Sequence, residues 1–341
     1  MGEKERLALI HSEPSTDNAI KSQRGWLLVL LPPQSMSIEP PVAGISTTAG
    51  PAMRALLANV IDYAGLFPPA NLTMPAATEH FSRCVQGSFS HALGRMVLPL
   101  ARLGEFEQAA LRLSLPAGFT WRLSVLAGPD PAADAAVIQD FNRRSSAARV
   151  VSIETKASTP AEVAARTTAL PGTLQVWVEV PVAGDVTQMV SAVRQSGRSA
   201  KIRTGGITVD AFPPAADVVR FWAACYQARV TAKATAGLHH PLGGLFPYTY
   251  EPGSPSGPMF GFMNILLTAA LTQSGGTTEQ AITLLTDADP ANFAVLSDVV
   301  VWRGFRFTTS HLTFMRDTLC RSFGSCSFME PLTGLKALAW L

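Results

Sequence analysis

The chain has 341 residues and a formal net charge of +2; 47% of its residues are apolar and only 15% are charged. Intrinsic disorder requires the opposite balance, with few apolar and many charged residues, so this composition predicts a folded protein. The near-neutral charge gives no global attraction to nucleic acid or to an anionic membrane surface. Basic residues are also spread along the chain instead of forming the stripe typical of nucleic-acid binding.

Cysteine content and hydropathy suggest a compartment. The four cysteines are too scattered for a disulfide scaffold, and none forms the CxxC pair of a zinc ribbon. We therefore expect reduced thiols in a cytoplasmic protein. The most apolar run, residues 26–31, ends at two prolines and is much shorter than the roughly 20 apolar residues of a membrane span. It also lies far from the N-terminus without a cleavage site, so we expect neither an anchor nor a signal peptide.

The sequence divides into two unequal parts. Residues 1–50 show no periodic pattern and become rich in Pro, Ser, Thr and Gly, which predicts a poorly ordered extension. Residues 51–341 predict a single α/β domain that contains a long loop at residues 238–258.

In the second part, β-rich runs alternate with helical stretches. We predict strands at residues 95–100, 121–127, 149–154, 174–181, 199–205 and 230–236. We predict helices at residues 52–61, 74–86, 104–114, 131–145, 160–169, 185–196 and 211–228, with start signals at Pro131, Pro160, Asp185, Asp210 and Pro213. This βα alternation indicates a parallel sheet.

Two further segments bring the number of predicted strands to eight. One precedes the others at Asp62–Phe67, and one follows them at Ser297–Phe305. Eight units favour a (βα)8 TIM-like barrel, in a regular or an irregular form, with an open doubly wound parallel sheet as the alternative. No GxGxxG motif follows the early strands, which argues against dinucleotide binding. Near the C-terminus we predict a core helix at Thr308–Phe323 and a pocket-lining turn around Cys326.

Four successive strands each have one apolar face and one polar face. Because helices must cover the outside of a barrel, the polar faces are expected to point inward. The inward set carries five charged residues toward the carboxyl ends of the strands, where barrel enzymes keep their active sites: Glu154, Glu179, Lys201, Arg203 and Lys233. The structural alternative is a set of buried ion pairs that hold the strands in register, although buried charge is costly without a function.

The two lysines share a local pattern, because Lys201 and Lys233 each precede a glycine by four residues on neighbouring strands. In matching register their ammonium groups would lie close together, and each would lower the pKa of the other. A lysine that is neutral near pH 7 is a nucleophile toward carbonyl compounds and forms a Schiff base.

This arrangement resembles the paired lysines of deoxyribose-phosphate-aldolase-type class I aldolases. The resemblance implies that Lys201 forms the imine and that Lys233 tunes it. More of the chain resembles an uncharacterised bacterial family that carries the motifs IDYAGLFPPA, KIRTGG, KATAGLHHP and SFGSCSFxEP, here Ile61–Ala70, Lys201–Gly206, Lys233–Pro241 and Ser322–Pro331. That second resemblance implies the domain boundaries and no particular reaction.

Several other residues are candidates for substrate binding. The aromatic loop at residues 238–258 is expected to form a lid or a pocket wall over the strand ends, in which His239 or His240 moves a proton or binds an anion. The remaining candidates are hydroxyl, carboxylate, guanidinium and glycine groups at strand ends: Asp62, Arg203, Gly205, Gly206, Thr235 and Gly237.

Together these features favour a lyase of the aldolase type that acts on a small anionic carbonyl compound and requires no cofactor. Glu154 and Glu179 would move protons in this mechanism. Three alternatives stay open: a Mg²⁺-assisted lyase or isomerase in which Glu154 and Glu179 hold the metal, a barrel that transfers phosphosugar or phosphoribosyl groups, and a non-catalytic ligand-binding protein. We expect no nucleic-acid or membrane partner, while a homo-oligomer is compatible with the sequence.

Overall fold

The computed structural model describes residues 20–21, 27–28 and 49–341. Most of the predicted extension at residues 1–50 therefore lies outside the described residues. Within that range, β1 (Ile20–Lys21) pairs in antiparallel fashion with β2 (Leu27–Leu28).

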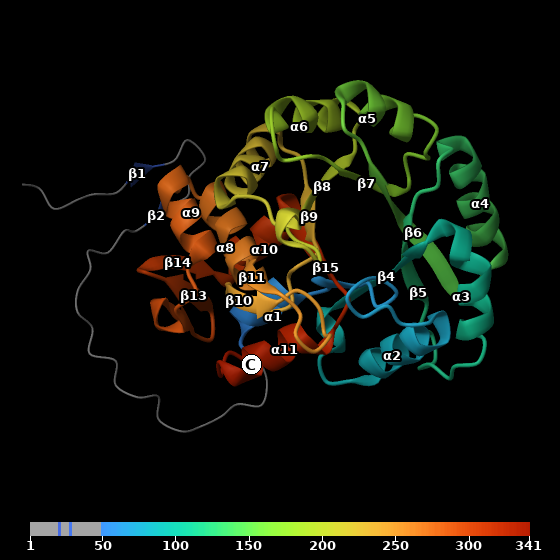
Figure 1. Ribbon diagram of the computed structural model, residues 1–341, viewed down its shortest axis with the longest axis horizontal. Helices are drawn as coiled ribbons and strands as arrows, with labels where there is room; N and C mark the ends of the chain where they lie inside the picture. Colours follow the sequence, from blue (N-terminus) through green and yellow to red (C-terminus); the bar gives the residue numbers. More distant parts are fainter. Residues whose placement is uncertain (1–19, 22–26, 29–48) are drawn as a thin grey trace, which may run out of the picture.

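Eight parallel strands form a closed barrel, which confirms the predicted (βα)8 fold and excludes the open sheet (Figure 1). In order around the barrel they are β3 (Ile61–Tyr63), β4 (Leu93–Pro99), β5 (Trp121–Leu126), β6 (Ala148–Lys156), β7 (Gln175–Glu179), β8 (Ser199–Arg203), β9 (Ala232–Thr235) and β15 (Cys320–Ser325). The last strand, β15, pairs with β9 on one side and with β3 on the other, which closes the ring.

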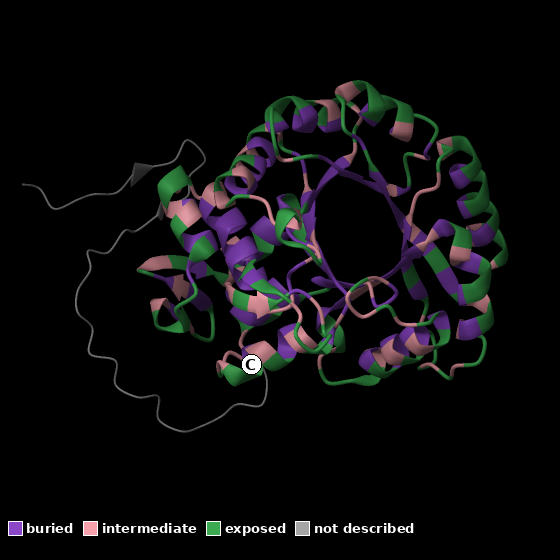
Figure 2. Cartoon of the chain, viewed as in Figure 1, coloured by how far each residue is buried: buried purple, intermediate pink, exposed green. Residues whose placement is uncertain are grey.

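Helices surround the barrel and bury their inner faces against it (Figure 2). They are α1 (Pro51–Leu57), α2 (Met74–Gln86), α3 (Leu103–Ala110), α4 (Pro131–Arg144), α5 (Pro160–Thr167), α6 (Val186–Gln195), α7 (Ala215–Ala228), α8 (Phe262–Gln273), α9 (Thr278–Thr286), α10 (Thr309–Thr318) and α11 (Met329–Ala337). Short 3-10 helices lie at η1 (Ser90–Ala92), η2 (Leu100–Arg102), η3 (Val209–Ala211) and η4 (Pro290–Asn292). No helix within the described ranges is both long enough and apolar enough to cross a bilayer.

The predicted helix-start signals work at three of the sites. Asp130 caps α4 ahead of Pro131, Thr159 caps α5 ahead of Pro160, and the Asp185 side chain caps α6. The prediction for the next helix was less accurate, because α7 begins only at Ala215 and Asp210 lies in η3 instead of capping it.

The predicted eighth strand was wrong. The segment Ser297–Phe305 contributes instead to a small antiparallel sheet of β12 (Phe293–Val295), β13 (Val299–Trp302) and β14 (Phe305–Thr308), at the side of the barrel. The barrel is closed by β15, part of which was predicted as the end of a helix at Thr308–Phe323. That helix, α10, ends at Thr318. The strand was missed because its inward residues, including Ser322 and Gly324, are small and polar and give no apolar signal.

The segment predicted as a long loop at residues 238–258 contains a hairpin. Strand β10 (Gly244–Pro247) pairs in antiparallel fashion with β11 (Ser256–Met259), which leads into α8. Residues Phe262–Leu271 of α8 are all buried, and this helix packs against α7, α9 and α10. The hairpin is thus anchored next to the core of the protein.

Candidate active site

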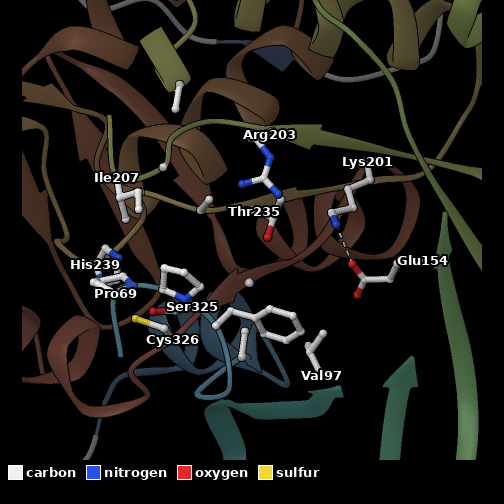
Figure 3. A pocket seen from close by; sticks show the side chains of 18 of the residues that line it. Pro69, Val97, Glu154, Lys201, Arg203, Ile207, Thr235, His239, Ser325 and Cys326 are labelled. Carbon is white, nitrogen blue, oxygen red and sulfur yellow. Dashed lines mark ion pairs between the residues drawn. The ribbon is translucent and has the colours of Figure 1, made fainter. Parts of the chain in front are cut away.

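A cavity of about 360 Å³ opens at the carboxyl ends of the barrel strands (Figure 3). We call it the carboxyl-end cavity. Its charged lining residues are three cations, Lys201, Arg203 and Lys233, and one anion, Glu154. Phe67, Pro69, Val97, Leu126 and Ile207 contribute apolar wall. A lining with more cations than anions favours an anionic ligand.

Strand register brings the two lysines together. Lys201 on β8 is the direct neighbour of Lys233 on β9, and Glu179 on β7 is the direct neighbour of Lys201. Neighbouring residues in a parallel register point to the same face of a sheet, and here that face is the inside of the barrel. The expected convergence of these side chains at one end of the barrel is therefore observed.

The lysines are linked by carboxylates. Lys201 Nζ lies 2.8 Å from Glu154 Oε2 and 2.8 Å from Glu179 Oε2. Lys233 Nζ lies 2.9 Å from the other oxygen of Glu154 and 2.5 Å from Asp62 Oδ2. We call these five residues the lysine–carboxylate network. Glu154 is its centre, since each of its oxygens binds one ammonium group, and all five side chains are buried.

Small hydroxyl groups complete the network. Ser124 donates a hydrogen bond to Glu154 at 2.8 Å and accepts one from Ser152, also at 2.8 Å. Ser322 donates to Asp62 Oδ2 at 2.8 Å. Burial removes the carboxylate oxygens from water, and the serine hydroxyls supply hydrogen bonds in place of the missing water.

Asp62 does not occupy its predicted position. We expected this carboxylate at a strand end among the substrate-binding groups, but it lies on β3 inside the barrel with no exposed surface and does not line the carboxyl-end cavity. The Arg95 backbone N–H donates to Asp62 Oδ1 at 3.0 Å. Room for the carboxylate depends on Gly94, where a Cβ atom would lie only 2.6 Å from Asp62 Oδ1.

The network favours the ionised form of its three carboxylates. Burial alone would raise the pKa of Glu154, but Lys201 and Lys233 outweigh it and the pKa falls far below its usual range. Burial likewise opposes ionisation of Glu179 and Asp62. Lys201 and Arg203 nevertheless lower the pKa of Glu179 to about 2, and Lys233 and Arg95 lower that of Asp62.

The prediction that the paired lysines lower each other's pKa was wrong for Lys201. Burial does favour the neutral amine, but Glu154 and Glu179 together raise the pKa of Lys201 above its ordinary value. The sequence showed two lysines on strands predicted to be neighbours. It did not show how many carboxylates would lie between them, because that number depends on how the barrel closes. The two carboxylates therefore favour the ammonium form of Lys201.

Arg203 and Thr235 lie at the mouth of the carboxyl-end cavity, one strand apart in register (Figure 3). The Arg203 side chain is 45% exposed, and its Nε lies 3.3 Å from Glu179 Oε1. This position leaves most of the guanidinium free to meet a ligand at the rim. Glu179 lies behind Lys201 and Arg203 and does not line the cavity itself.

The candidate glycines have different roles. Gly206 and Gly237 line the cavity, but Gly205 does not. A Cβ atom on Gly205 would lie 2.6 Å from the Phe212 ring and 2.9 Å from Gly237 Cα, so this glycine allows two loops to pack closely. The predicted anion-binding role of Gly205 therefore finds no support in the structure.

The two histidines also differ. His239 lines the cavity, and its Nδ1 lies 2.9 Å from Glu330 Oε2. His240 faces away and stacks on Phe246 with ring centroids 3.5 Å apart, so it is not among the lining residues. Burial, together with the neighbouring His239, lowers the pKa of His240.

Glu330 joins three segments above the cavity that the sequence did not connect. The Tyr250 hydroxyl donates to Glu330 Oε2 at 2.8 Å and lies 3.6 Å from Cys326 Sγ. Cys326 lines the cavity directly after β15, as expected for a pocket-lining turn. Burial raises the pKa of this thiol, which disfavours a thiolate nucleophile.

The carboxylates do not form a free metal-binding set. Both oxygens of Glu154 are engaged by ammonium groups, and no group of three or more His, Cys, Asp or Glu side chains in the described part of the chain could hold a metal ion.

Sequence reasoning missed Asp62 as a partner of Lys233, the serines beside Glu154, and Glu330. Ser124 could have been found by extending the inward–outward alternation to residues 121–127. Glu330 lies in the conspicuous motif at Ser322–Pro331, but nothing local links it to a histidine 91 positions away.

Comparisons with protein-family models, with curated proteins and with solved structures found no match to this chain. The functional assignment therefore depends on the geometry of the site.

Proposed function

We propose that the protein is a lyase of the aldolase type that binds a small anionic carbonyl compound in the carboxyl-end cavity and forms a Schiff base with it at Lys201. One observation carries the proposal: two lysines in register share a single carboxylate beside a cation-lined cavity at the carboxyl end of the barrel. This is the end at which barrel enzymes carry out their chemistry.

Lys201 must lose a proton before it can react. Glu154 and Glu179, each 2.8 Å from its ammonium group, are the nearest bases. Transfer of the proton to either carboxylate leaves a neutral amine, whose lone pair attacks the substrate carbonyl carbon and forms the C–N bond while the C=O π pair moves to the oxygen. The nitrogen then gives up a proton and the oxygen gains one, which yields a neutral carbinolamine. Ligand binding that displaces water would favour this transfer, because desolvation disfavours the charged forms of both the lysine and the carboxylate.

The second stage releases the carbonyl oxygen as water and needs a proton donor. His239 suits this role because Glu330 engages its Nδ1, which leaves Nε2 as the ring nitrogen able to serve a substrate. Loss of water from the protonated carbinolamine gives the iminium ion, and this ion withdraws electrons from the bond that breaks in a lyase reaction. Lys233, which contacts both Asp62 and Glu154, orients the network.

Trapping of the imine tests the proposal. The protein is incubated with pyruvate, glycolaldehyde or glyceraldehyde 3-phosphate and with sodium cyanoborohydride, and the reduced adduct is located by peptide mass spectrometry. We expect one adduct at Lys201, lost in Lys201→Met and formed at least about tenfold more slowly in Lys233→Met. Formation should accelerate as the pH rises from 7 to 9, because the raised pKa of Lys201 limits the supply of neutral amine.

Lys336→Met is the matched control, because Lys336 is an exposed lysine on α11 whose ammonium lies over the Phe89 ring. It should label as the wild type does. If none of these carbonyl compounds gives an adduct at Lys201, or if Lys201→Met and Lys233→Met fold normally and keep full ligand affinity, the proposed chemistry is wrong and a non-catalytic binding protein is favoured.

A further inference from the structure

A second cavity opens at the opposite end of the barrel, where the strands begin. We call it the amino-end cavity; its volume is about 340 Å³. Its charged lining residues are four arginines, Arg95, Arg122, Arg316 and Arg321, and two aspartates, Asp62 and Asp317. No lysine lines it, whereas lysines dominate the carboxyl-end cavity.

The four arginines are in different electrostatic situations. Arg316 is buried, and its guanidinium donates to the carbonyl oxygens of Leu56, Ala58, Cys320 and Arg321, so it holds the cavity wall together. Arg321 forms an exposed pair with Asp317 at 3.0 Å. Arg95 lies 3.9 Å from Asp62, whose shorter contact is with Lys233.

Arg122 is the lining arginine whose guanidinium has no partner of either kind in the described part of the chain. It is exposed on β5 and lines the cavity, and no carboxylate or carbonyl partner for its side chain occurs among the described residues. The wall also holds two buried donors, Arg95 Nε and Trp177 Nε1, that lack an acceptor within the described ranges of the chain. A buried donor without an acceptor costs free energy. A bound oxyanion could accept a hydrogen bond from the Arg95 guanidinium after a small rotation of that side chain.

We propose that the amino-end cavity is a second ligand site that binds a small anion bearing phosphate or carboxylate groups through Arg95, Arg122 and Arg321. Arginine presents parallel N–H groups that match the oxygens of phosphate or carboxylate, and its charge does not depend on pH in the physiological range. Trp177 lies between the two cavities, with Lys233 Nζ 5.7 Å and the Arg95 guanidinium 5.9 Å from its ring centroid. The proposal does not depend on the chemistry at Lys201.

Calorimetric titration of the full chain with inorganic phosphate, pyrophosphate and succinate tests the proposal and distinguishes phosphate from dicarboxylate ligands. We expect Arg122→Ala to weaken binding at one site by roughly tenfold or more and Arg203→Ala to leave that site unchanged. Arg194→Ala, which removes an exposed arginine on α6 remote from both cavities, should bind as the wild type does.

Arginine modification with phenylglyoxal locates the site independently of affinity. Ligand should slow the modification of Arg122 and Arg321 at least about threefold and leave that of Arg194 unchanged. If Arg122→Ala does not fold, Arg321→Ala provides the same comparison at an exposed position. Unchanged binding in the arginine variants, or modification of Arg122 at the same rate with and without all three anions, would overturn the proposal.

Discussion

The charged residues that line the two cavities give a similar net charge at each end of the barrel, but they differ in kind. At the carboxyl end, lysines are buried and fully engaged by carboxylates in the lysine–carboxylate network. At the amino end, arginines line an open cavity, and Arg122 lacks a carboxylate partner in the described chain. A lysine can give up its proton and react, whereas an arginine stays charged and can only bind. This contrast underlies the two proposals, which place chemistry at the carboxyl end and ligand recognition at the amino end.

The largest effect is expected from Glu154→Gln, because this carboxylate binds both ammonium groups. Removing one partner of a buried ion pair leaves buried charge uncompensated, and we expect a loss of about 3–5 kcal/mol in the free energy of unfolding, measured by urea denaturation. The corresponding change at the amino end, Arg122→Gln, should stay within about 0.5 kcal/mol. Equal losses in the two variants would remove the distinction between the ends.

A somewhat smaller effect is expected on acidification. The pKa of Glu179 is about 2 in the folded protein and near 4.5 ordinarily, so this group stabilises the fold fully above pH 4.5 and loses that contribution as the pH falls toward 2. Asp62 and Glu154 act in the same direction. For Glu179 alone we expect on the order of 3 kcal/mol, measured as the difference in unfolding free energy between pH 6 and pH 2.

Glu179→Gln should flatten this part of the acid dependence. Asp317→Asn at the amino end breaks only an exposed pair with Arg321, so it should cost no more than about 1 kcal/mol and leave the acid dependence intact. An acid dependence that is identical in Glu179→Gln and in the wild type would contradict the assignment.

The smallest effect concerns the loops above the carboxyl-end cavity. Gly205→Ala forces a Cβ atom against the Phe212 ring and Gly237, and we expect a loss of about 1–3 kcal/mol in thermal or urea unfolding. Gly172→Ala is the control, because open space surrounds that position. If both variants are equally stable, the loops at this end are not tightly packed around Gly205.

Local pattern predicted much of the fold and the inward position of four of the five residues in the lysine–carboxylate network, all but Asp62. Alternation along residues 174–181 and 199–205 correctly placed Glu179 and Lys201 inside, and the equal spacing from Lys201 and Lys233 to their glycines predicted their register. The eighth strand was missed because the inside of this barrel is polar, which removes the apolar signal from β15.

The electrostatic state of the site could not be predicted for a different reason. The charge of Lys201 depends on Glu154 and Glu179, and Asp62 reaches Lys233 past the intervening strand β15 from a position 171 residues earlier in the chain. Such contacts depend on which strands become neighbours and on their stagger once the barrel has closed. A single sequence does not contain that information in any local pattern.

The position of β15 between β3 and β9 has a consequence for biosynthesis. Until residues 320–325 have left the ribosome, the nascent chain has two unpaired strand edges, at β3 and β9, and the charged interior is open to water. Hydration then stabilises Asp62 and Lys233 separately, and their pairing is favoured only as the final strand docks and excludes solvent. Chains that stall before this point expose both edges at once, which makes them natural targets for chaperones.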